Sequence, residues 1–177
     1  MSAIDPGNPP NEDIGNTFGW RNWFFLLYKY VKGISITGAI LGTTTNDNAA
    51  VGYIGEYVES NISSSSAVSF TTNVSKNITS ISLTAGDWDV FGMFGLTGGS
   101  VPTKVTVGTS TTSNTIGSED SVYLHQASVN LTSNPRHVFP TKRYSLASTT
   151  TIYLVGNVVF PSSTAKGFGR ISARRVR

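Results

Sequence analysis

The sequence lacks cysteine altogether, and only 13% of its 177 residues are charged. The absence of cysteine excludes disulfides, thiolate metal sites and a cysteine nucleophile. The net charge of +3 is too small to indicate nucleic-acid binding by itself. No stretch approaches the roughly 20 apolar residues of a membrane span, and the first residues lack the basic start and apolar run of a secretory signal. We therefore expect no membrane span and no direct nucleic-acid contact, and stability that comes from packing and association.

Residues that carry chemistry are also scarce. The two histidines, His125 and His137, fall on different expected strands and outside any zinc-binding spacing. No nucleophile elbow, phosphate loop or dinucleotide fingerprint is present. The remaining candidates are acidic or amide side chains: Asp87 with Asp89, Glu56 with Glu59, and the loop Asn46-Asp47-Asn48. Asp87 suits a turn, and the loop lacks calcium-site spacing. The sequence predicts a protein that is not an enzyme, with no cofactor and no metal.

The composition favours a mainly β protein. Hydrophobic residues make up 38%, and 18 glycines accompany abundant serine, threonine and asparagine. From residue 50 onward, short alternating runs are separated by turn residues, which predicts an antiparallel β-sandwich or jelly roll of about eight strands. The expected strands are 50–58, 67–72, 77–84, 88–96, 104–110, 123–130, 137–146, 150–160 and 167–176.

The stretch 79–94 gives the clearest alternation. If Gly86-Asp87 is a two-residue hairpin loop, Leu83 faces Val90 on one buried side of the ribbon. The opposite face carries Phe91 and Met93, which solvent exposure does not explain. We expect these two side chains to contact another sheet, another copy of the chain or a partner.

The N-terminal region differs from the rest. Residues 1–16 are rich in proline and glycine and predict an extended arm, and 17–32 predict one short helix that ends at Gly33. The apolar side chains of this helix surround it almost completely: Trp20, Trp23, Phe24, Phe25, Leu27, Tyr28 and Val31. Either the helix covers the open end of its own sheet, or it packs on copies of itself or a larger assembly, which its excess apolar surface favours. We expect residues 1–33 to serve attachment and oligomerisation, and 34–177 to form the β-sandwich domain.

The chain ends with a basic cluster: Arg170, Arg174, Arg175 and Arg177. These charges could keep a solvated strand from pairing edge to edge with another molecule. They could instead contact an acidic partner surface or packaged nucleic acid. A solvated strand or a protein contact is favoured, because this segment lacks interleaved aromatic residues for base stacking.

Three segments, PGNPPNEDIGNTFGWRNWFFLLYKYV, SISLTAGDWDVFG and GFGRISARRVR, resemble those of virion structural proteins from tailed bacteriophages, of the tail-fibre, spike, collar or head-decoration type. The resemblance implies a homo-oligomer, often a trimer, that docks on other virion proteins through its N-terminal segment. It also implies a location in the virion after assembly in the bacterial cytoplasm, and a host-surface receptor as a further partner. The alternatives are a capsid decoration or head-fibre protein, and a glycan-binding or glycan-cleaving domain. Glycan binding would use Tyr123, Trp88 or the loop 108–120.

Overall fold

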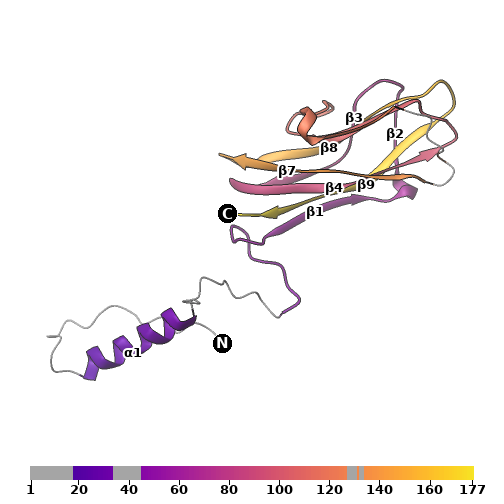
Figure 1. Ribbon diagram of the computed structural model, residues 1–177. Coiled ribbons are helices and arrows are strands. Elements are labelled where there is room, and N and C mark those ends of the chain that lie inside the picture. The colour runs from indigo at the N-terminus through magenta and orange to yellow at the C-terminus, as the bar shows by residue number, and fades with distance from the viewer. Residues whose placement is uncertain (1–17, 34–44, 127–130, 132–133) are drawn as a thin grey trace. The chain divides into compact units, whose positions relative to one another are not determined.

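The computed structural model describes residues 18–33, 45–126, 131 and 134–177 (Figure 1). The chain divides into two compact units, residues 1–47 and residues 48–177. The first unit contains the helix α1 (Phe18–Gly33), close to the bounds that its periodicity predicts. The predicted arm lies outside the described residues.

The second unit is a two-layered antiparallel β-sandwich (Figure 1). Its elements are β1 (Tyr57–Ile62), η1 (Ser64–Ser66), β2 (Val68–Ser69), β3 (Lys76–Leu83), β4 (Gly86–Gly98), β5 (Lys104–Ser110), η2 (Glu119–Ser121), β6 (Val122–His125), β7 (Arg136–Leu146), β8 (Thr150–Val159) and β9 (Ala165–Arg175). One sheet has the order β1-β9-β4-β7, with β2 also paired to β9, and the other has the order β3-β8-β5-β6. Apart from the short β2, this is the strand order of a jelly roll, which confirms the predicted fold class.

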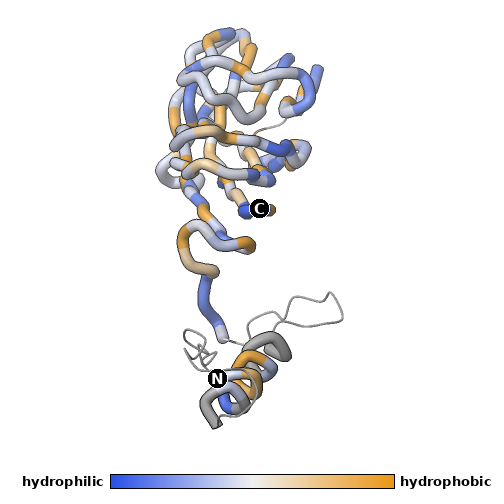
Figure 2. The backbone as a smooth tube through the Cα atoms, turned by 90° about the vertical axis from the view of Figure 1, so that its left-hand side faces the viewer, coloured by the Kyte–Doolittle hydropathy of each residue, from blue (hydrophilic) through white to orange (hydrophobic). Residues whose placement is uncertain are grey.

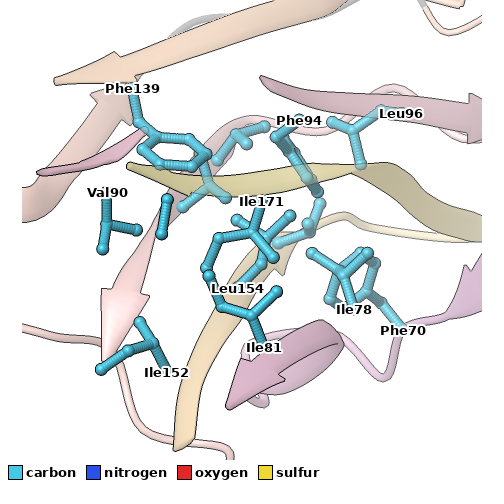
Figure 3. Close-up of a cluster of buried hydrophobic side chains, with 14 of the residues drawn as sticks. Phe70, Ile78, Ile81, Val90, Phe94, Leu96, Phe139, Ile152, Leu154 and Ile171 are labelled. Atoms are coloured by element: carbon cyan, nitrogen blue, oxygen red, sulfur yellow. The ribbon is translucent and has the colours of Figure 1, made fainter. Parts of the chain in front are cut away.

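The core lies between the two sheets, where alternate side chains of each strand meet (Figure 3). In β3, a register shift between Asn77 and Thr79 brings Ile78 and Ile81 to the same buried side. The largest side chains that are almost completely enclosed are Trp88, Phe94, Phe139, Leu83, Leu96, Leu131, Ile152, Leu154 and Ile171. Each contributes about 1.5–3 kcal/mol relative to an exposed position, so the core accounts for the fold without any disulfide.

The predicted hairpin within 79–94 is wrong. β3 pairs with β8, whereas β4 pairs with β7 and β9, so residues 84–85 carry the chain from one sheet to the other. Leu83 and Val90 are both fully buried, as the alternation predicts, but they enter the core from opposite sheets. The Trp88 indole donates a hydrogen bond to the carbonyl oxygen of Thr84 at 3.0 Å, which closes this turn.

The side chain of Arg175 holds the turn in place. It leaves the end of β9, is only 5% exposed, and donates from Nε to Glu56 Oε2 at 2.9 Å. Its Nη1 donates to the Ala85 carbonyl at 2.8 Å, and its guanidinium lies 4.3 Å from the centroid of the Trp88 ring. At Gly86, where φ is +133°, a Cβ atom would lie 2.1 Å from Nη1 of Arg175. The turn therefore needs glycine at this point, both for its backbone conformation and for the space that the arginine occupies.

We expect Arg175→Met to lower the free energy of unfolding by about 3–5 kcal/mol, because it leaves the buried Glu56 carboxylate without its counter-ion. Urea unfolding at pH 7 measures this loss. Arg174→Met is the matched control: Arg174 is exposed, and a surface change of this kind costs within about 0.5 kcal/mol. Equal losses in the two variants would contradict the role of the buried pair.

Candidate association surfaces

The outward face of the sheet β1-β9-β4-β7 carries apolar side chains at its centre. Phe91 of β4 lies opposite Ser172 of β9, and Met93 lies between Arg170 of β9 and Val138 of β7. Phe91 and Met93 are half-buried, and Val138 is 73% exposed. We call these three residues, Phe91, Met93 and Val138, the sheet patch. Phe91 and Met93 thus face outward, away from the core, and Val138 is contributed by a strand distant in sequence.

Aromatic rings and arginines surround the sheet patch. The Tyr57 ring lies 6.5 Å from that of Phe91, and the Arg174 guanidinium lies 5.9 Å from the centroid of Tyr57. At another position, Arg136 lies 5.9 Å from the centroid of the Phe168 ring. The C-terminal segment alone shows no such interleaving, because Tyr57 and Arg136 come from β1 and β7, which the fold places beside β9 and β4. Aromatic, methionine and arginine side chains are those enriched in protein interfaces.

The four C-terminal arginines have separate environments. Arg174 is exposed, and Arg170 lies 3.9 Å from Glu59 with both side chains about half exposed. Arg177 forms an ion pair with Asp87. Arg175 is enclosed beside Glu56, so the prediction that it contacts a partner is wrong for this residue. Side-chain alternation already places Arg175 on the same side of β9 as the buried Ile171 and Ala173, so the sequence contained this signal.

Asp87 is the anionic centre of this end of the sheet. Its side chain is 5% exposed, and Oδ2 accepts a hydrogen bond from Arg143 at 2.8 Å and another from Arg177. The hydrogen bond from Arg143, together with that from Arg177, holds the pKa of the Asp87 carboxyl well below its usual range. Asp87 therefore has a structural role: its carboxylate links β4 to β7 through Arg143 and to the C-terminus through Arg177. This role replaces the catalytic one considered for Asp87 with Asp89.

We expect Asp87→Asn to be less stable than the parent protein at pH 7, and this difference to shrink as the pH falls below about 4. The folded state holds the ionised carboxylate more tightly than the unfolded state, so its stabilisation is present above the unfolded pKa and is lost in acid. Urea unfolding between pH 7 and pH 3 measures it. Asp89→Asn, which removes a carboxylate that forms no ion pair among the described residues, is the control. A difference that stays constant with pH would contradict this account.

A second apolar surface lies in the turn before β1, where the sequence predicts a strand. Val51, Tyr53 and Ile54 are 75%, 68% and 62% exposed. We call these three residues the apolar turn. Its backbone is held firmly, since the Gly52 N–H donates to Glu56 Oε2 at 2.8 Å and the Gly55 N–H donates to the Arg175 carbonyl at 3.0 Å. The same ion pair that organises the sheet crossing therefore presents three apolar side chains to solvent.

The helix α1 forms a third apolar surface. Phe24, Phe25 and Tyr28 are 50%, 53% and 56% exposed, and orange apolar segments mark the described part of this helix in Figure 2. Trp20 and Trp23 are half-buried, and each packs a ring within 5.6 Å of the Phe24 ring. Leu27 is also half-buried, while the side chain of Val31 lies outside the described part. Within the described residues, no helix is long and apolar enough to cross a membrane.

The residues considered for glycan chemistry do not form a binding platform in the described part of the chain. Trp88 is fully buried, and Tyr123 packs its ring 4.8 Å from that of His137. A shallow, open depression does exist, but no aromatic side chain lines it: its residues are Thr71, Asn73, Val74, Ser75, Lys76 and Asn114. Asn48, considered for metal binding, instead pairs through its amide with the backbone of Tyr57 at 2.7 and 3.0 Å. No group of three metal-ligating side chains occurs among the described residues.

No protein-family model matches the sequence, and no curated protein matches it. Among solved structures, the chain is similar to VP2 of infectious bursal disease virus in its subviral particle, with a TM-score of 0.44 and 10% identity over 78% of this chain and 37% of that chain. A structure of the Gt strain of the same virus gives a TM-score of 0.40 and 14% identity, over 76% and 37% of the two chains. The chain thus spans little more than a third of these neighbours. A likeness of this degree assigns it neither a family nor a function.

Proposed function

We propose that this chain is a non-enzymatic structural component of a virion, a homotrimeric protein of the tail-fibre or spike type that docks through its N-terminal segment and contributes to host attachment. The observation that carries the proposal is apolar surface left exposed on a well-packed fold: the sheet patch, the apolar turn and one side of α1. Contiguous exposed apolar groups of this kind mark sites of association. The resemblance of three segments to tailed-phage virion proteins supports the same role.

The sheet patch is best suited to contact copies of the same chain. Its central side chains are already half-buried and sit on a rigid sheet, so little conformational freedom is lost when a neighbour covers them. The carboxylates of Glu59 and Asp89 lie on this face beside arginines. The face therefore carries both positive and negative charges, which could form ion pairs with the opposite charges of a neighbouring copy. A closed trimer would bury these groups at about 1.5–3 kcal/mol for each large side chain.

The helix α1 is better suited to a different virion protein. It contains Arg21, Lys29 and Lys32 and no acidic residue, so packing α1 against its own copies would bring like charges together. An apolar groove edged by carboxylates on another component would cover its aromatic side chains and satisfy its charge. We therefore assign self-association to the sheet patch and attachment to α1.

We expect Phe91→Glu to convert the trimer to monomers at micromolar concentration, because an unpaired carboxylate at a buried contact costs several kcal/mol. Light scattering coupled to size-exclusion chromatography measures the mass, and circular dichroism confirms that the fold is retained. Ser80→Glu, an exposed position on the outward face of the other sheet, is the control and should leave the trimer intact. A parent protein that is monomeric at this concentration would contradict the proposal.

We expect Phe24→Asp to reduce incorporation into virions at least about tenfold while the trimer forms normally, because the apolar contact of α1 is lost and an anion is placed there. Asn22→Asp adds the same charge at an exposed polar position of α1 and serves as the control. Quantitative immunoblots of purified particles measure incorporation. Normal incorporation of Phe24→Asp would refute attachment through α1 and leave self-association untouched.

A further inference from the structure

The fold brings the two histidines of this chain together. His125 ends β6, an edge strand of one sheet, and His137 is the second residue of β7, an edge strand of the other. Their ring centroids lie 6.0 Å apart with the planes at 26°. Tyr123, also on β6, packs its ring 4.8 Å from His137 at 22°. These three rings thus connect the two sheets of the sandwich along the edge formed by β6 and β7.

The surroundings of His137 favour the neutral, unprotonated form of its imidazole. Nε2 of His137 is buried and has no hydrogen-bond partner among the described residues, and neither histidine forms an ion pair there. Burial, and then the charge of His125, lower the pKa of His137. A proton on His137 would therefore place a cation in a partly desolvated position beside the His125 ring.

Among the described residues, no charged group of the surrounding elements forms an ion pair with either histidine. On η2, Asp120 pairs with Lys142 of β7 at 2.9 Å, beside the exposed Glu119. The carboxylates of β4 point to the outward face of the sheet, where Asp87 binds Arg143. The other charges of the packed strands are cations: Arg136 on β7 and Lys104 on β5. Residues 126–133, which follow His125 directly, are GlnAlaSerValAsnLeuThrSer and contain no ionisable side chain.

We propose that Tyr123, His125 and His137 form an acid-sensitive clasp that holds the β6 and β7 edges of the sandwich together at neutral pH and releases them when His137 is protonated. The clasp is independent of the proposed virion role, since it concerns the fold of one copy. Its release would loosen β7, the strand that also contributes Val138 to the sheet patch.

The direction of the effect follows from proton linkage. The unfolded chain binds protons at these imidazoles near pH 6.5, whereas folded His137 binds its proton only at lower pH. The stabilisation from the clasp is therefore complete above about pH 6.5 and is lost as the pH falls from there toward the folded pKa. Below the folded pKa no further loss arises from this group.

Thermal unfolding of the parent protein tests this. We expect its Tm to fall by about 3–5 °C between pH 7.5 and pH 5.5, and that of His137→Phe, which keeps an aromatic ring but cannot titrate, to fall by less than about 1 °C. Tyr123→Phe keeps both histidines and the ring contact, and should show the parental loss. A parental loss in His137→Phe would overturn the proposal.

Proton NMR of the parent protein gives a second test that does not depend on the fold of any variant. With two histidines, the spectrum contains two imidazole Cε1–H signals, and sequential Overhauser contacts in the parent protein, to Leu124 for His125 and to Val138 for His137, assign them. We expect the His137 signal to titrate below pH 6.5, and hydrogen exchange of β6 and β7 to rise selectively at pH 5.5. A His137 signal that titrates at or above pH 6.5 would overturn the clasp even if His137→Phe fails to fold.

Discussion

The buried pair between Arg175 and Glu56 is the constraint on which the arrangement of this domain depends. It joins the end of β9, the segment that enters β1 and the crossing from β3 to β4, three parts that are far apart in the sequence. A buried ion pair contributes little net stability unless its remaining donors are satisfied. Here the Arg175 guanidinium also donates a hydrogen bond to the Ala85 carbonyl and stacks on the Trp88 ring. The ion pair thereby specifies where the chain changes sheets.

The same pair links the core to the surfaces. Glu56 Oε2 accepts both from Arg175 and from the Gly52 N–H, so the buried carboxylate also shapes the backbone of the apolar turn. At this end of the domain, Asp87 binds Arg143 and Arg177 on the outward face, one residue before Trp88 in the interior. Adjacent residues of β4 therefore hold the C-terminus from both sides of the sheet. Such a rigid base reduces the entropic cost of covering the apolar groups beside it.

The outer faces of the two sheets differ in the side chains that they carry. A jelly roll needs only one face of each sheet to be apolar, and Ser80 and Ser82 on the outer face of β3 follow that rule. Phe91, Met93 and Val138 break it on the opposite sheet. Local departures of this kind from the expected pattern are most often found where a protein meets a partner. The fold itself does not assign the function, which rests on these side chains.

Alternation and turn residues in the sequence were sufficient to predict the β-sandwich, the bounds of most strands, the helix near residue 18 and the outward direction of Phe91 and Met93, because each depends on neighbours within a few residues. Strand partners depend on contacts across the whole chain. Only the tertiary structure could show that residues 84–85 cross between sheets, that Arg175 pairs with Glu56, that residues 50–55 form a turn, and that His125 meets His137. Each of these depends on how the strands of the two sheets are brought together, which local periodicity does not encode.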